Sequence, residues 1–180
     1  LPSVKNLNEL NQYSRIENLN GIQYRVPKDA IFNGESKGTY QDIRHYKKGA
    51  IIFSVSTTEL AKNPYVHTFI TDGHYNFNRE LHTFWDIYRY HPTPDYINYS
   101  VVWNNNIPGI SIHSYEPYSD IHILNFESYD GTYHFIYTIF YPKFLSADEV
   151  QKLRNMIEFF DSTNNPEFKL QQHVVFPENR

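Results

Sequence analysis

Nine histidines make imidazole chemistry the first kind of function to consider in this sequence. Imidazole titrates near neutral pH, transfers protons and is a common metal ligand. His113 and His122 lie in two apolar runs separated by Glu116-Pro117-Tyr118-Ser119. If Pro117 and Tyr118 form the centre of a tight turn, His113 lies directly across from His122, with the two Cβ atoms about 5 Å apart. This register predicts a histidine pair that can share a divalent metal or perform acid–base chemistry.

The pair is incomplete as a metal site, and the sequence leaves an alternative open. A divalent metal needs further ligands, and local spacing fixes no carboxylate beside either histidine. Asp72 and His74, in a predicted loop, are the candidates to join the pair in acid–base chemistry. The alternative is two ordinary strand histidines. Pro117 also fits a type I turn better than the primed turns of tight hairpins, so the register is open as well.

Aromatic side chains form a second group of candidates, suited to binding rather than to catalysis. They make up 17% of the chain, with few aliphatic residues beside them. Exposed rings at strand ends suit protein or carbohydrate recognition, because they offer contact area at low entropic cost. The alternative is that most of these rings fill the core and its rim. The candidate binding residues are Tyr88, Tyr90, Tyr96, Trp103, Tyr115 and Tyr118.

Thiol, serine-nucleophile and phosphate chemistry find no support in the sequence. The chain has no cysteine, which excludes disulfides, thiolate zinc sites and a cysteine nucleophile. It has neither a Gly-x-Ser-x-Gly elbow nor a Ser-x-x-Lys pair, and its seven glycines form no phosphate-binding loop. We therefore expect no cofactor beyond the divalent metal considered at His113 and His122, and the sequence favours a protein that is not an enzyme.

Charge and hydropathy bear on the partners and the location. The formal net charge is −4, and we expect the basic cluster Arg44–Lys48 to be a solvated strand end, so no nucleic-acid partner is predicted. No apolar run reaches the roughly 18 residues of a membrane span. The chain starts at Leu1 rather than Met, which we interpret as a processed product; a removed leader or a lipid anchor before Leu1 is one explanation and a shortened chain is another. The favoured location is extracytoplasmic, as a secreted protein or a lipoprotein.

Alternating apolar and polar residues predict the elements that position these candidates. We expect a strand over residues 21–26 that ends at Pro27, a loop over 28–38, and two strands over 39–46 and 50–57. A meander then follows, with strands at Ile97–Trp103, Gly109–Tyr115, Ile121–Ser128 and Thr132–Tyr141. The Asp130-Gly131 pair is a hairpin signal, and a two-residue turn there places Glu127 opposite His134 and Phe126 opposite Phe135.

Two helices are predicted around this meander. Apolar residues recur at helical spacing over residues 77–90, and that helix carries His82 and Asp86 on its polar face. The second helix begins with a capping box from Ser146 to Glu149 and continues to Ser162. The length of 180 residues and the lack of a dividing linker predict a single α+β domain, with residues 1–13 and 164–180 as peripheral or partly ordered ends.

The order of these landmarks resembles the PsbP-like domain family. An early strand ends at Val26-Pro27, a hairpin and a central helix follow, and Ile107-Pro108-Gly109 precedes a mid-chain strand. A long strand then leads into a terminal helix that closes between Ile157 and Ser162. The resemblance covers residues 14–163. It implies an antiparallel sheet between helices, an α/β/α sandwich, and an accessory role rather than catalysis.

Three hypotheses of function follow from the sequence. The first is a non-catalytic accessory or binding module that acts through a protein partner. The second is a metal-dependent or acid–base enzyme that uses the cross-strand histidines. The third is an inhibitor or immunity-type protein, because small acidic single domains include such proteins.

Overall fold

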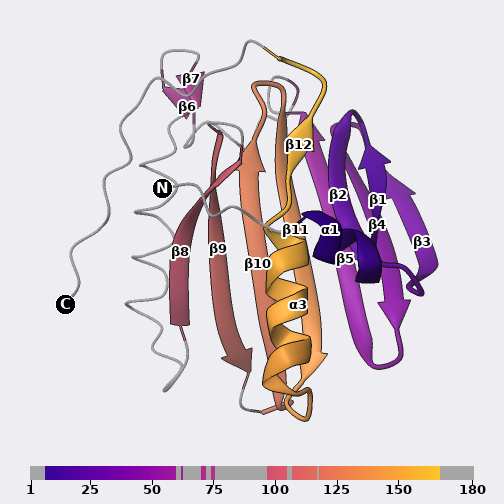
Figure 1. Cartoon of the computed structure of the whole chain (residues 1–180). Coiled ribbons are helices and arrows are strands. Elements are labelled where there is room, and N and C mark those ends of the chain that lie inside the picture. Colours follow the sequence, from indigo (N-terminus) through magenta and orange to yellow (C-terminus); the bar gives the residue numbers. More distant parts are fainter. Residues whose placement is uncertain are drawn as a thin grey trace, which may run out of the picture.

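A computed structural model describes residues 7–59, 62, 70–71, 74–75, 97–104, 107–116 and 118–166. For residues 70–71, 74–75, 97–104 and 108 it describes the backbone alone. Within these residues the chain forms a seven-stranded and a three-stranded antiparallel sheet, a two-stranded pair and two helices (Figure 1). The β-rich α+β fold predicted from the sequence is confirmed.

The large sheet has the strand order β3-β4-β5-β11-β10-β9-β8. It therefore joins two sequential groups of strands, with β5 paired to β11 at the junction. Apolar alternation accounts for most of these strands. The last four of them in the sequence, β8 to β11, confirm the predicted meander. The bounds are β3 (Ile31–Lys37), β4 (Gln41–Lys48), β5 (Ile51–Glu59), β8 (Ile97–Asn104), β9 (Ile107–Glu116), β10 (Ile121–Tyr129) and β11 (Tyr133–Pro142).

The turn between β10 and β11 lies one residue later than predicted. Its two central residues are Gly131 and Thr132, because the Asp130 carboxylate accepts hydrogen bonds from the backbone N–H groups of Thr132 and Tyr133 at 2.9 and 2.7 Å. An aspartate that binds its own turn in this way fixes where the turn begins.

The predicted β10–β11 register is consequently wrong by two residues. Glu127 lies opposite Ile136 rather than His134, and Phe126 lies opposite Tyr137 rather than Phe135. A shift of two keeps every side chain on its face of the sheet, so the predicted partners remain diagonal neighbours. His134 Nε2 accordingly lies 3.8 Å from Glu127 Oε1, and the Phe126 and Phe135 rings are 6.2 Å apart.

A small sheet packs in front of the large one (Figure 1), and it combines two strands that precede the large sheet in the sequence with one that follows it. It has the order β1-β2-β12, and the β1–β2 hairpin turns at Asn20-Gly21, where both residues have positive φ. Gly21 is required there, because a Cβ at that position would also lie 2.2 Å from the Asn164 side chain. The elements are α1 (Leu7–Tyr13), β1 (Ser14–Leu19), β2 (Ile22–Pro27) and β12 (Asp161–Ser162).

Residues 31–37 were predicted as loop, and the structure places them in β3, an exposed edge strand. The solvent exposure of β3 explains the error: without a buried face the strand has no apolar alternation, and its pairing with β4 is interrupted between Phe32 and Glu35. Such an irregularity blunts an open sheet edge against further pairing. The remaining short strands, β6 (Ile70–Thr71) and β7 (His74–Tyr75), pair with each other.

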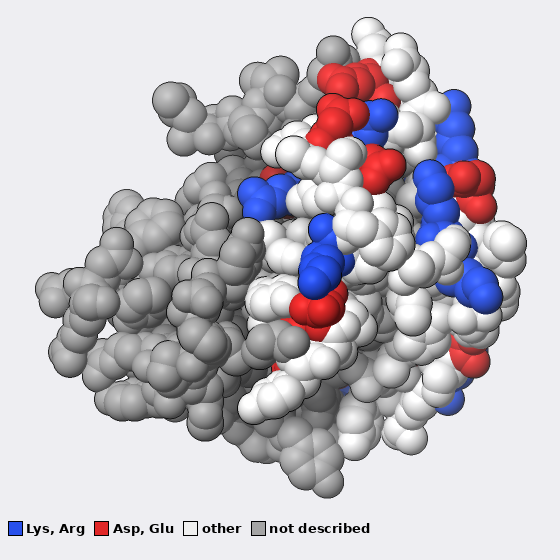
Figure 2. All heavy atoms as spheres, turned by 90° about the horizontal axis from the view of Figure 1, so that it is seen from below, with Lys and Arg blue, Asp and Glu red and all other residues white. Residues whose placement is uncertain are grey.

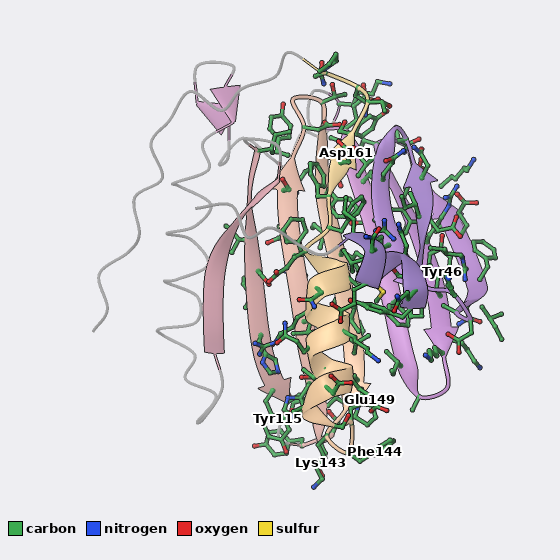
Figure 3. The ribbon with its side chains drawn as sticks, viewed as in Figure 1. Tyr46, Tyr115, Lys143, Phe144, Glu149 and Asp161 are labelled. Atoms are coloured by element: carbon green, nitrogen blue, oxygen red, sulfur yellow. The ribbon has the colours of Figure 1, made fainter. Side chains whose placement is uncertain are left out.

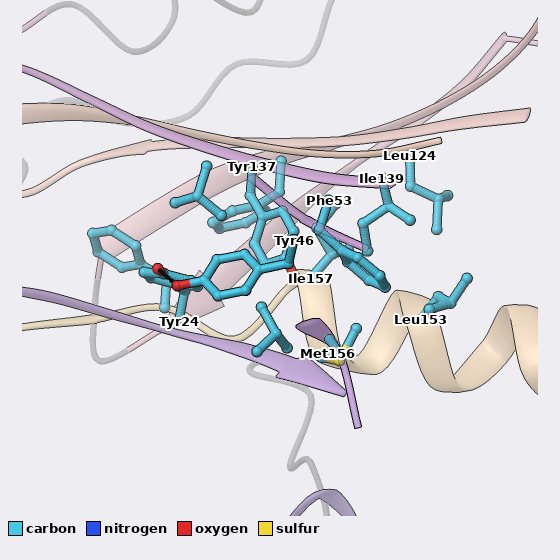
Figure 4. Close-up of a cluster of buried hydrophobic side chains, with 14 of the residues drawn as sticks. Tyr24, Tyr46, Phe53, Leu124, Tyr137, Ile139, Leu153, Met156 and Ile157 are labelled. Atoms are coloured by element: carbon cyan, nitrogen blue, oxygen red, sulfur yellow. Dashed lines mark hydrogen bonds between the residues drawn. The ribbon is translucent and has the colours of Figure 1, made fainter. Parts of the chain in front are cut away.

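The core lies between the large sheet on one side and the helix α3 (Ala147–Ile157) with the small sheet on the other (Figure 4). The predicted capping box at Ser146 and Glu149 is present and starts this helix. From the small sheet, the fully buried Tyr24 contacts the rings of Tyr46 and Tyr137. The core side chains of α3 are Leu153, Met156 and Ile157.

Both ends of the described chain contact the rest of the fold. Leu10 of α1 is only 1% exposed. At the other end, Asn164 and Asn165 donate hydrogen bonds to Asp130, to its carboxylate and its carbonyl respectively. Residues 167–180 and the predicted helix over 77–90 lie outside the described residues.

Candidate functional site

The structure brings His113 and His122 together, although not in the predicted register. His113 pairs with Leu124 and His122 pairs with Tyr115, again a shift of two residues that keeps both histidines on one face. The two rings are therefore diagonal neighbours, with His113 Nε2 3.1 Å from His122 Nδ1. Tyr141 on β11 stacks on His122, at 5.0 Å between ring centroids, and its hydroxyl lies 2.9 Å from His113 Nε2.

Arg154 of α3 determines which protons these histidines carry. Its Nη2 lies 2.7 Å from His113 Nδ1, and a guanidinium can only donate hydrogen bonds. His113 Nδ1 must therefore be the acceptor, which places the ring proton on Nε2. That proton is donated toward His122 Nδ1 and the Tyr141 oxygen, so His122 in turn carries its proton on Nε2. The assignment follows from the hydrogen-bond network.

The electrostatics of the cluster keep His113 neutral at physiological pH. Burial, the Arg154 charge and the neighbouring His122 together lower the pKa of His113 to about 4. Burial also lowers the pKa of His122, an effect that the nearby Asp120 carboxylate opposes. Because both rings are neutral and their tautomers are fixed, hydrogen bonds rather than ion pairs connect the side chains of this cluster.

The same tautomers disfavour a metal on His113. Coordination through Nε2 requires a lone pair on that nitrogen, and the contact with Arg154 requires the proton there instead. In metal sites the second imidazole nitrogen instead donates, usually to a carboxylate or a carbonyl. Among the residues that the structure describes, no group of three or more histidine or acidic side chains is placed to hold a metal ion. The divalent metal at His113 and His122 stays a prediction.

A cleft of about 420 Å³ lies over this cluster, between α3 and the ends of β9, β10 and β11. Its cations are Arg154 and Lys143, and no carboxylate of the described residues lines it. The α3 residues that line the cleft lie on a different face of the helix from its core residues Leu153, Met156 and Ile157. The lining residues are His113, His122, Tyr141, Lys143, Leu145, Ala147, Val150, Gln151 and Arg154.

Three aromatic residues lie next to this cleft, at what we call the aromatic end: the half-buried Tyr115 and the exposed Tyr118 and Phe144. Tyr118, in the β9–β10 turn, is 99% exposed, and Phe144, in the β11–α3 turn, is 77% exposed. The ion pair between Lys143 Nζ and Asp120 Oδ2, at 3.2 Å, ties the two turns together. Figure 3 shows Tyr115, Lys143 and Phe144 at this one end of the molecule.

Tyr115 connects the aromatic end to the histidines. Its hydroxyl donates a hydrogen bond to Asp120, and this bond, followed by the contact with Lys143, lowers the pKa of the Asp120 carboxyl. Its ring lies 4.8 Å from that of His122. The turn, the ion pair and the cleft are therefore one connected surface.

Charged side chains of both signs are interspersed on this side of the molecule. Figure 2 views the molecule from the aromatic end, and no patch of a single sign dominates its described surface. Long-range attraction is therefore a weak guide to a partner here, and individual charges such as Arg154 matter more.

The remaining predicted site residues are placed only in part. Trp103 lies in β8 and His74 in β7, of which the backbone is described. The other predicted residues, Asp72, His82, Asp86, Tyr88, Tyr90 and Tyr96, lie outside the described residues.

Three residues of the site were missed by sequence reasoning: Tyr141, Phe144 and Arg154. Arg154 lies in the last turn of a helix, where a cation has an ordinary explanation in the helix dipole. Tyr141 lies near the end of a strand in which the alternation of apolar residues already explains its presence. Of the three, only Phe144 had a signal in the sequence, because it is an aromatic residue between a strand-ending proline and a helix cap.

None of the described helices is long and apolar enough to cross a membrane. No protein-family model matches this chain, and no curated protein matches it.

Proposed function

We propose that this chain is a non-catalytic binding module that engages a protein partner through its aromatic end. The observation that carries the proposal is the exposure of Tyr118 and Phe144 on two turns that an ion pair holds together. Large exposed rings on anchored turns suit protein recognition, because they bury much apolar area at little entropic cost. An inhibitor or immunity protein would use the same kind of surface, and the identity of the partner separates the two roles.

The chemistry of the histidine cluster supports a binding role over an enzymatic one. A general base needs a lone pair directed at the substrate, and in this network the lone pairs of both Nδ1 atoms accept hydrogen bonds from within the cluster. The rings therefore act as donors. Donors suit recognition of a partner group better than abstraction of a proton.

A PsbP-like α/β/α sandwich and an extracytoplasmic location belong to the same proposal. Support for the sandwich comes from Ile110 and Ile112, which are buried on the face of the large sheet opposite α3. A sheet with both faces buried suits helices on both sides. Fractionation of source cells with an antibody to the chain tests the location.

Site-specific photo-crosslinking tests the protein-binding proposal. A photoreactive phenylalanine analogue replaces Tyr118 in the full chain, which is then irradiated in source-cell material and analysed by mass spectrometry. We expect one enriched crosslinked protein. With that partner purified, Tyr118→Ala and Phe144→Ala should each weaken binding about tenfold or more, as expected for central aromatic contacts.

Phe32 provides the matched control position. It is an exposed aromatic residue, 53% accessible, on the edge strand β3 far from the aromatic end. The photoreactive residue at this position should give no enriched product. Equal crosslinking at both positions, or a partner bound unchanged by the two alanine variants, would contradict the proposal.

A further inference from the structure

Arg154 is a half-buried cation whose charge no described carboxylate balances. Its guanidinium has one hydrogen-bond partner among the described residues, the neutral His113. Its Nε is buried and makes no hydrogen bond with a described residue. Buried charges in proteins are normally paired, so an unbalanced guanidinium at the wall of a cleft requires a physical reason.

The other charges near the cleft define which anion would fit. Lys143 is already paired with Asp120 at 3.2 Å, which leaves Arg154 as the unbalanced charge. One unbalanced positive charge matches a monoanion, and a carboxylate is the monoanion that polypeptides carry. A phosphate dianion would bring one negative charge more than the cleft balances.

We propose that this cleft binds a carboxylate of the protein partner, an aspartate or glutamate side chain, with Arg154 as the cation that pairs with it. The inference rests on the proposed function, because it assigns the chemistry of the partner. A planar guanidinium matches a carboxylate in geometry and charge. Exposed rings at Tyr118 and Phe144 lie beside the cleft, so the partner residue is expected to follow or precede an apolar one.

The surrounding side chains are arranged to favour the same anion. The hydrogen-bond network leaves His122 with its proton on Nε2, so this ring offers a donor and no acceptor at that nitrogen. His113 holds the guanidinium by accepting from Nη2, which orients Arg154 without neutralising it. The neutral histidine thus positions the cation while leaving its charge available for the partner.

Nuclear magnetic resonance of the full chain tests this inference with a defined probe, N-acetylglutamate methylamide, whose side-chain carboxylate is its one charge. We expect saturable shifts of the Arg154 Nε–H signal and a dissociation constant on the order of millimolar. The uncharged probe N-acetylglutamine methylamide should give no saturable shift. Inorganic phosphate should bind more weakly than the carboxylate probe, and tighter phosphate binding would overturn the carboxylate assignment.

Variants of α3 provide the controls for this titration. Arg154→Gln should weaken carboxylate binding about tenfold or more, and Arg154→Lys should retain part of it, as a charge without the planar fork. Lys152→Gln removes the same charge from the same helix, but Lys152 lines a separate apolar pocket, so binding should be unchanged. Equal losses in Arg154→Gln and Lys152→Gln would mean a general charge effect and overturn the inference.

The inference and the proposed function fail separately. If the carboxylate probe does not bind while crosslinking at Tyr118 persists, the carboxylate site is wrong and the binding module stands. If the probe binds but Tyr118 yields no partner, the proposed function is wrong, and the assignment of the carboxylate to a protein partner falls with it. Loss of partner affinity in Arg154→Gln, matched by loss of probe binding, would support both.

Discussion

Arg25 and Arg154 lack the same kinds of partner but differ in the contacts that they do make. Neither has a carboxylate partner among the described residues, and each has a buried Nε without a hydrogen bond to them. Arg25, on β2, is only 3% exposed and is bonded to Ser14 and Asn11, at 3.2 and 2.8 Å. The Phe159 ring covers its guanidinium at 4.7 Å. Arg154 has one neutral partner and lines a cleft.

The difference separates a structural arginine from a binding one. Neutral acceptors and an aromatic face can hold a buried guanidinium in place, since both interact favourably with its charge. Arg25 has these contacts on several sides and joins α1, β1 and β2. Arg154 lines a cleft with room for another group, which the proposed carboxylate would occupy.

Replacement of the two arginines by alanine is the most direct comparison. Arg25→Ala should lower the free energy of unfolding by about 2–4 kcal/mol, because it removes several hydrogen bonds to a charged group together with buried side-chain packing. Arg154→Ala should lower it by about 1 kcal/mol or less. Chemical denaturation of both variants measures the difference. Equal losses would show that Arg154 is a structural residue.

His113 makes the stability of the folded protein depend on pH. Its pKa of about 4 in the folded protein lies below the ordinary value of 6.5. The unfolded chain therefore binds this proton first as the pH falls, so the contribution of His113 to stability is complete above about pH 6.5 and is lost toward pH 4. After discounting for solvent screening, we expect a loss of about 1–2 kcal/mol over this range.

Denaturation between pH 7 and pH 4 of the wild type and of His113→Gln measures that contribution. The variant keeps an acceptor for Arg154 and removes the titrating ring, so its stability should depend less on pH. His45→Gln, on β4 and away from the cleft, is the control and should follow the wild type. A wild-type profile in His113→Gln would rule out the assigned role of burial.

The smallest effect is expected at the ring that covers Arg25. Phe159→Leu keeps most of the apolar volume and removes the aromatic face, at a cost of about 0.5–1 kcal/mol in unfolding free energy. In the Arg25→Ala background the same change should cost less, because no cation remains to be covered. A double-mutant cycle measures this coupling, and a cycle with no coupling energy would contradict the account of Arg25.

Sequence reasoning predicted elements better than it predicted their registers. The meander and the start of the capped helix were predictable because apolar alternation and the capping box are local patterns. The end of that helix was predicted wrongly, because it ends at Ile157 and residues 161–162 form β12. The β1 strand was missed although Asn20-Gly21 is a typical two-residue turn, since the polar residues before it hide the hairpin. Edge strand β3 carries no burial signal at all. The two registers were predicted wrongly because the turns that set them, at Asp130 and after Pro117, differ from the tight turns that were expected.

Within the site, the sequence by itself determined that His113 and His122 share a face, because a shift of two residues preserves the side of a strand. It also determined the helix that carries Arg154. Only the tertiary structure decided that Tyr141 and Arg154, 28 and 41 residues further along the chain, meet His113. The physical reason is that strand pairing and helix packing, rather than local spacing, place these groups together. The proton positions, and with them the proposed carboxylate chemistry, follow from that meeting.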